Sequence, residues 1–341
     1  MVSSSIDALF LGSIPLSSNE EVFATISTAL NGRVKQIPDG ETGPRANFIG
    51  CQYPVLPNAS LQARWGGQAP ADQTTLDAKS SDLNPIGYDD WAISSFAVFE
   101  DLQKSGKIPS DVRFQVSVPS AFGVVQGFVD SRFCAEIEPL YEEKLAAALA
   151  RIQSSIPKDK LSLQFDLPFE IGALEYESGN ITDPHWKAWF PKVQQGLIER
   201  LARLFKLVDE DVPLGLHLCY GDIGHVHFVD PKDTGILVQF IKAIHEGVEP
   251  IHDISYIHIP VPKDKTEAAY FEPLKSLEIN PNTKLYLGVI HPNDEEGSKS
   301  RLEAARSAYH GPCGVSTECG LGRTPKEDLE SIISIAKSLT T

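Results

Sequence analysis

The chain has 341 residues, of which 42% are hydrophobic and 22% charged, a balance typical of a globular protein. With 46 acidic against 30 basic residues the formal charge is −16, which argues against nucleic acid or an anionic membrane as a partner. The five cysteines are odd in number and scattered, so they indicate a reducing compartment. We expect a cytoplasmic protein, because the first residues lack a basic segment and no apolar run approaches the roughly 18 residues of a membrane span. The sequence leaves the oligomeric state open.

Short apolar segments with the pattern of strands alternate with longer amphipathic segments along the whole chain. The expected strands are residues 7–13, 33–38, 112–118, 161–167, 213–219, 254–260, 284–290 and 313–318. The expected helices are about 19–30, 92–105, 137–153, 191–208, 233–247, 265–276, 297–309 and 325–339. Ser18-Asn-Glu-Glu21 is a start signal for the first helix, and Thr324-Pro-Lys-Glu327 is one for the last.

Eight strands that each precede a helix predict an α/β fold, a single (β/α)8 TIM barrel domain over residues 1–341. An open doubly wound sheet is the alternative, but no Gly-x-Gly-x-x-Gly follows the first strand. Residues 41–91 form a long insertion after the second strand, and we expect it to be ordered and to cover the barrel mouth. A second excursion, at about 168–190, carries Glu170 and two tryptophans.

The expected C-terminal ends of the strands, where barrel enzymes place their active sites, are unusually polar. They carry Ser13, Asp39, Glu41, Ser117, Ser120, Asp166, His217, Cys219, His258, His291, Glu318 and Cys319. Random placement of nine histidines and five cysteines would rarely put three histidines and two cysteines there. A metal ion is the simplest explanation for this gathering.

His217 and Cys219 lie two residues apart in an expected strand, so they point to the same face, opposite Leu216 and Leu218. A buried histidine beside an inert thiol is the simpler interpretation of an isolated His-x-Cys. The barrel, however, brings Cys319 to the same mouth. One imidazole and two thiolates suit Zn²⁺, with a fourth position that is open or filled by another side chain.

Several other candidates have plain structural alternatives. Asp166 should point into the barrel, where a Lys or Arg could pair with it. Asp39 and Glu41 flank a glycine and could form only a turn. His225 and His227, after the fifth strand, could be additional ligands or solvated loop residues.

Five motifs resemble the catalytic barrel of cobalamin-independent methionine synthase and its single-barrel relatives, and they occur in that family's order. They are Leu11-Gly-Ser-Ile-Pro15, Gly40-Glu41, Gln164-Phe-Asp166, His217-Leu-Cys219-Tyr220 and Glu318-Cys319-Gly-Leu-Gly-Arg323. The resemblance covers nearly the whole chain and belongs to the wider group of uroporphyrinogen decarboxylase and methionine synthase-like barrels. It also implies the TIM-barrel fold.

The resemblance implies His217, Cys219 and Cys319 as zinc ligands. In the family a glutamate on strand six completes the site, and here His258 stands at about that position, so we expect His258 as the fourth ligand. Family contacts to an amino-acid substrate match Ser13, Glu41 and Asp166, which suit a substrate ammonium group. Asp39, beside Glu41, joins this expected substrate-binding set.

The resemblance predicts a zinc-dependent enzyme that transfers a methyl or other alkyl group to a thiol, activated as a zinc thiolate. Its substrate would be a small thiol or an amino-acid-like molecule. His291, His258 and Asp166 are the expected catalytic residues, with His291 handling the released proton. Methyltetrahydrofolate is a poor candidate donor, because the chain has one barrel and residues 116–123 lack the family's tryptophan.

Two other functions remain open. The barrel could perform lyase, decarboxylase or hydrolytic chemistry on a small molecule, with His258 and His291 as acid and base. Alternatively, it could bind a small molecule without catalysis. Zinc content separates the transferase from the other enzymes, and the effect of Cys219→Ser and Cys319→Ser on ligand affinity tests the binding protein.

Overall fold

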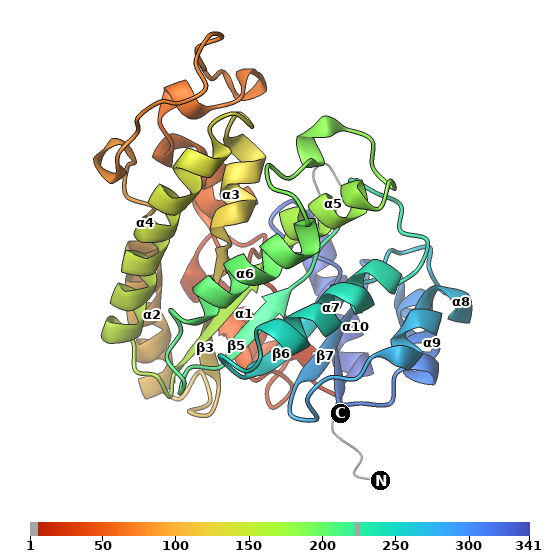
Figure 1. Cartoon of the computed structure of the whole chain (residues 1–341). Helices are drawn as coiled ribbons and strands as arrows, with labels where there is room; N and C mark the ends of the chain where they lie inside the picture. Colours follow the sequence, from red (N-terminus) through yellow and green to blue (C-terminus); the bar gives the residue numbers. More distant parts are fainter. Residues whose placement is uncertain (1–5, 222–225) are drawn as a thin grey trace.

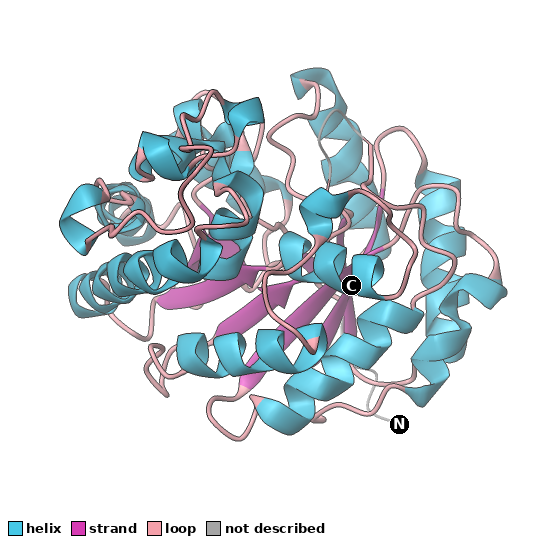
Figure 2. Cartoon of the chain, turned by 45° about the horizontal axis from the view of Figure 1, so that its top comes forward, coloured by secondary structure: helices cyan, strands magenta, loops and turns pink. Residues whose placement is uncertain are grey.

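A computed structural model describes residues 6–221 and 226–341, and its centre is one sheet of eight parallel strands surrounded by helices (Figure 2). The strands are β1 (Ala8–Leu9), β2 (Gln36–Pro38), β3 (Arg113–Pro119), β4 (Leu161–Asp166), β5 (Leu214–His217), β6 (Ile254–Pro260), β7 (Lys284–Ile290) and β8 (Cys313–Thr317). They pair in the order β1-β8-β7-β6-β5-β4-β3-β2. Parallel bridges Ala8–Val34 and Ser13–Gly40 join the two edges, so the sheet is a nearly closed barrel. The predicted (β/α)8 fold is confirmed.

The α-helices cover the outside of the barrel (Figure 1). They are α1 (Asn19–Ala29), α2 (Tyr88–Lys104), α3 (Ala121–Phe128), α4 (Cys134–Ser155), α5 (Pro168–Glu177), α6 (Val193–Phe205), α7 (Gly235–Gly247), α8 (Ala268–Phe271), α9 (Glu295–Ala308) and α10 (Leu329–Leu339). Among the described residues, none of these helices is both long and apolar enough to cross a bilayer.

Some helix boundaries differ from the expectation. The start signal at Ser18 is confirmed, because its side chain accepts a hydrogen bond from the Glu21 backbone N–H at 3.2 Å. The start signal at Thr324 is wrong: a 3-10 turn over Lys326–Asp328 comes first, and α10 begins at Leu329. The expected helix over 265–276 is one α-helical turn, α8, followed by the 3-10 helix Glu272–Ser276.

The helices α3 and α5 were not expected from the sequence. Every residue of α3 is buried, and most of α5 is buried as well. A helix that is covered on all sides has no polar stripe, so it gives no amphipathic period to detect.

Residues between β2 and α2 form short 3-10 helices instead of α-helices or strands. These are Gly43–Ala46, Phe48–Val55, Asn58–Ser60, Ala63–Trp65 and Ser80–Asp82. This segment, orange in Figure 1, lies beside α3 and the upper end of α4. The last residues of the expected insertion, from Tyr88 on, belong to α2.

The barrel interior is a layer of polar and aromatic side chains, whereas the main apolar core lies between the strands and the helices. Gln115 accepts a hydrogen bond from Gln36 at 2.8 Å and donates one to Gln164 at 3.2 Å. Tyr256 donates to the same Gln164 at 2.9 Å. These bonds fix the strand register below the mouth, because buried amides need partners inside the protein.

Two glycines make room for tyrosines in this interior. A Cβ at Gly215 would lie 1.9 Å from the Tyr256 ring, and a Cβ at Gly314 would lie 2.4 Å from the Tyr286 ring. Both contacts are far shorter than any real packing distance. The glycine in the Leu214–His217 strand is therefore required by the ring opposite it.

We predict that Gly215→Ala lowers the free energy of unfolding by about 1–3 kcal/mol, because the added methyl group overpacks the barrel interior. Urea denaturation measures this change. Glu303→Ala, on the exposed side of α9, is the control and should change stability by less than about 0.5 kcal/mol. Equal stability of Gly215→Ala and the parent protein would contradict this packing.

Candidate metal centre and adjoining pocket

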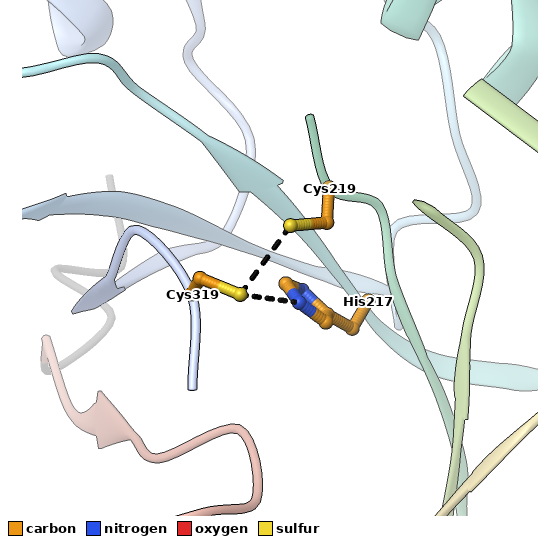
Figure 3. A group of neighbouring side chains, drawn as sticks. All are labelled: His217, Cys219 and Cys319. Carbon is orange, nitrogen blue, oxygen red and sulfur yellow. Dashed lines mark hydrogen bonds between the residues drawn. The ribbon is translucent and has the colours of Figure 1, made fainter. Parts of the chain in front are cut away.

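Three metal-ligating side chains converge at the C-terminal ends of β5 and β8, as Figure 3 shows. The Sγ atoms of Cys219 and Cys319 are 3.4 Å apart, and Cys319 Sγ is 3.7 Å from His217 Nε2. One ligand atom from each residue lies within 4.8 Å of the other two. His217 ends β5, and the two cysteines follow their strands by two residues, so barrel closure alone brings together residues 100 positions apart.

Two of the three spacings among these atoms are close to those of a tetrahedral zinc site. With Zn–S of about 2.3 Å and Zn–N of about 2.0–2.1 Å, two sulfurs lie about 3.8 Å apart, and sulfur and nitrogen about 3.6 Å apart. The observed distances of 3.4 and 3.7 Å differ from these values by a few tenths of an ångström. The hydrogen bond with Cys319, together with burial, raises the pKa of the Cys219 thiol, so a cation is needed to hold it as a thiolate.

His258 lies behind His217 and orients it. Its Nε2 is 3.0 Å from the Thr317 carbonyl oxygen, which can only accept, so this nitrogen carries the proton. Its Nδ1, 2.8 Å from His217 Nδ1, is then the acceptor in the neutral ring. His217 therefore donates from Nδ1, and its Nε2 lone pair is left to face the two sulfurs.

Burial keeps both imidazoles neutral. It lowers the pKa of His258 to about 3, and it lowers the pKa of His217 well below the ordinary value, with a further contribution from His258. A neutral imidazole is the form that ligates a metal. Both ring nitrogens of His258 are thus used within the protein, and the structure does not place this residue in the ligand cluster as we expected.

The strand register explains why β6 provides no ligand at the level of the sulfurs. His217 pairs with His258 across β5 and β6, and the next residue of β6 on the same face is Pro260. Proline has no side-chain donor atom. The side of the cluster that faces β6 is therefore not closed by a protein ligand from that strand.

The other histidines near the mouth lie apart from the three-residue cluster. His291 donates from Nε2 to the Val261 carbonyl at 2.9 Å, and its Nδ1 is 3.8 Å from Glu318. His227 lies 3.0 Å from the other Glu318 oxygen. His291 and Glu318 line a second cavity of about 330 Å³, on which Cys319 also borders. His225 lies outside the described residues.

The cluster opens onto a pocket of about 350 Å³. Ser13, Glu41 and Asp166, three of the four expected substrate contacts, line this pocket together with His217, Cys219 and Cys319. Asp166 pairs with His217 across β4 and β5, which places the carboxyl beside the metal ligands. The structure therefore brings three of the four expected ligands and three of the four expected substrate contacts to one cavity.

Asp39 is the expected substrate contact that the structure does not bring to the pocket. Arg45 bonds to its Oδ2 at 2.8 Å, and Ser95 donates to the same atom at 2.8 Å. Its Oδ1 accepts from the Glu41 backbone N–H at 2.9 Å. Asp39 thus forms the turn that the sequence allowed as an alternative, and this turn holds Glu41 at a positive φ of 46° against Gly12.

The two pocket carboxyls are held in an environment that disfavours their charge. Burial, followed by the neighbouring Asp39, raises the pKa of Glu41 to about 8. Burial, followed by Glu41, raises the pKa of Asp166 well above its ordinary value. Gln164 donates to Asp166 at 2.8 Å, so an amide takes the place of the Lys or Arg partner considered from the sequence. A cation placed between the carboxyls would relieve this penalty.

Sequence reasoning missed part of this pocket. Arg323 lines it, and so do aromatic residues from the two long excursions. Trp186 is one of the two tryptophans noted in the second excursion, but Phe48, Phe169 and Phe228 gave no signal, because only the fold turns their rings toward the cavity.

Comparisons with known proteins agree with the fold. No protein-family model and no curated protein sequence matches the chain. A putative vitamin-B12-independent methionine synthase from Listeria monocytogenes has a similar structure, with a TM-score of 0.51 at 13% identity over 98% of this chain and 99% of that one. A B12-independent methionine synthase from Shewanella sp. W3-18-1, in complex with selenomethionine, gives a TM-score of 0.45 at 12% identity over 74% of this chain. The match spans 64% of the Shewanella protein. At 13% identity the likeness to the Listeria protein shows the fold alone.

We predict that Glu41→Gln makes the stability of the protein less sensitive to a rise in pH from 5 to 8. The folded-state pKa of about 8 lies above the ordinary value of 4.5, so Glu41 favours the folded state at low pH, and this contribution is lost as pH rises from 4.5 through 8. The stability of the parent relative to Glu41→Gln should fall by a few kcal/mol between pH 5 and pH 8.5 in urea denaturation. Glu303→Gln is the control, and parallel pH profiles for the parent and Glu41→Gln would disprove the account.

We also predict that His258→Phe weakens zinc binding about 10- to 100-fold while a zinc-loaded protein can still be formed at high zinc, since only the orientation of His217 is lost. Competition with a chelator measures this affinity. Tyr256→Phe, two residues earlier on β6, is the control for packing and should bind zinc normally. Unchanged zinc affinity in His258→Phe would show that His258 does not orient His217. A loss of zinc affinity as severe as that of a Cys219 or Cys319 variant would show that His258 is itself a ligand.

Proposed function

We propose that this protein is a zinc-dependent enzyme that transfers a methyl or other alkyl group to the sulfur of a small thiol. The observation that carries the proposal is the convergence of His217 Nε2 with the Cys219 and Cys319 sulfurs beside a pocket that contains two buried carboxyls. Three protein ligands with an open side are typical of catalytic zinc, whereas structural zinc has four.

His217, Cys219 and Cys319 would hold the zinc ion. When bound, zinc lowers the pKa of a coordinated thiol, so that its sulfur is present as the nucleophilic thiolate at neutral pH. The hydrogen bonds from His217 to His258 and from His258 to Thr317 keep the His217 lone pair directed at the site. The backbone N–H of Gly221 donates to Cys219 Sγ at 3.2 Å and supports negative charge on that sulfur.

Glu41 and Asp166 would bind a cationic group of the thiol substrate. A substrate ammonium placed between them would compensate their buried charge, which the protein itself does only in part through Arg45, Arg323 and a hydrogen bond with Ser13. Because Asp166 adjoins His217 in the register, an amino acid bound there would have its side-chain sulfur near the metal ligands. This arrangement supports an amino-acid-like thiol as the acceptor.

His291 stays a proposed proton carrier. It does not line the substrate pocket, but with Glu318 it lines the second cavity that borders Cys319. A proton that leaves the thiol would have to pass Glu318 to reach it. Asp166 and His258 are better described as positioning groups, the first for the substrate and the second for His217.

We predict that the parent protein binds about one equivalent of zinc and that Cys219→Ser and Cys319→Ser each reduce this below about a tenth of an equivalent, because each removes one of three ligands. Elemental analysis of untagged protein measures the metal, and mass spectrometry of a model thiol measures alkylation. Cys134→Ser, a buried thiol in α4, is the control and should keep both zinc and activity. A parent protein that stays below a tenth of an equivalent after zinc supplementation would overturn the proposed function.

A further inference from the structure

The outer part of the pocket is lined by six aromatic side chains from separate segments, which we call the aromatic wall: Phe48, Trp65, Phe128, Phe169, Trp186 and Phe228. Neighbouring rings contact one another. The ring centroids of Trp186 and Phe228 are 4.3 Å apart, and those of Phe169 and Trp186 are 5.4 Å apart. Trp65 meets Phe128 edge to face at 5.4 Å. The wall and the three clustered side chains thus line the same pocket, and Trp65 of the wall is 39% exposed to solvent.

The backbone is shaped to hold these rings. A Cβ at Gly172 would lie 2.1 Å from Trp186, and one at Gly221, which has a φ of +75°, would lie 2.8 Å from Phe228. A Cβ at Gly127 would lie 3.0 Å from Phe169. Close packing of a ring on a glycine fixes the ring in place. Because the glycines leave room for rings in fixed positions, the aromatic residues form a preorganised surface.

At Trp65 the wall offers a ring face to a ligand and no free indole N–H. The indole N–H of Trp65 donates to the Gly127 carbonyl at 2.8 Å, so the polar edge of this ring is used within the protein. The faces of the aromatic rings carry π-electron density, which attracts cations as well as apolar groups.

The charges around the pocket indicate whether a cation, a neutral molecule or an anion would bind to the wall. Among the lining residues that the structure describes, Glu41 and Asp166 are acidic, and Arg323 is the single Arg or Lys. The charge of Arg323 favours the ionised form of Glu41. Arg64 lies outside the lining, over the Trp65 ring at 5.3 Å. The whole chain carries a charge of −16. A cationic donor would meet ring faces and would favour the ionised forms of Glu41 and Asp166, whereas the net charge of the chain disfavours an anionic donor.

We propose that the aromatic wall is the subsite for a cationic alkyl donor, a sulfonium or a quaternary ammonium compound. The inference rests on the proposed function, since the donor is what the thiol substrate would attack. In that reaction the thiol sulfur forms a bond to the alkyl carbon and loses its proton. The bond from that carbon to the positive sulfur or nitrogen breaks, and its electron pair leaves with a neutral sulfide or tertiary amine. No oxidant or further reactant is required.

The test compares a cation with a neutral molecule of the same shape. Choline and 3,3-dimethylbutan-1-ol differ in that a carbon replaces the charged nitrogen, and trimethylsulfonium represents the other donor class. Isothermal titration calorimetry on the zinc-loaded protein should show choline, trimethylsulfonium or both binding at least tenfold more tightly than the neutral alcohol. The stronger of the two cations identifies the donor class.

Substitutions then locate the binding. Trp186→Leu and Phe228→Leu should each weaken cation binding at least tenfold, whereas Trp189→Leu, a tryptophan of the same excursion outside the pocket, should not. Equal affinity for the cations and the neutral alcohol, no binding of either cation, or normal binding in both wall variants would overturn the inference. Zinc content is measured on every sample. If the protein holds zinc normally but binds neither cation, the subsite alone is refuted. If the protein binds a cation but cannot be loaded with zinc, the proposed function alone is refuted.

Discussion

Closure of the eight-stranded sheet is the constraint on which the candidate site depends. Cys219 and Cys319 belong to segments 100 residues apart, and their sulfurs are 3.4 Å apart only because β5 and β8 end at the same mouth. The two edges of the sheet meet through short bridges near Ala8 and Ser13. A polar interior of glutamines and tyrosines holds the register below them. The ligand geometry is therefore a property of the whole barrel and of no single motif.

The site combines two electrostatic arrangements that a small cationic species would complete. In the proposed function, two sulfurs and one oriented imidazole would hold a metal cation, and the Glu41 and Asp166 carboxyls would bind a cationic group of the substrate. Each arrangement is costly when its partner is absent, because burial disfavours unpaired charge. The hydrogen bonds from His217 to His258 and from His258 to Thr317 preorganise the site, because they fix the His217 tautomer independently of a metal ion.

Much of the fold and part of the site follow from the sequence, for identifiable reasons. The two-residue spacing of His217 and Cys219 predicts a shared face on a strand over 213–219; β5 ends at His217, so Cys219 follows the strand instead of belonging to it. The eight strand–helix units predict that Cys319 joins them. The place of His258 could not be predicted, because it depends on a carbonyl of β8, Thr317, that only the folded barrel brings to its ring. In the same way, the sequence did not decide whether Asp39 and Glu41 contact the substrate or only form a turn. In the structure Asp39 supports the turn and Glu41 lines the pocket. The aromatic wall combines residues of loops with residues of α3 and α5, two helices that leave no amphipathic period in the sequence.

X-ray absorption at the zinc edge of the purified protein tests the central claim most directly. We expect a first shell of two sulfurs at about 2.3 Å and one imidazole nitrogen at about 2.0–2.1 Å, completed by one exchangeable light atom that a thiol ligand replaces with a third sulfur. A shell of nitrogen and oxygen alone, or one with two imidazoles and no exchangeable position, would contradict the account.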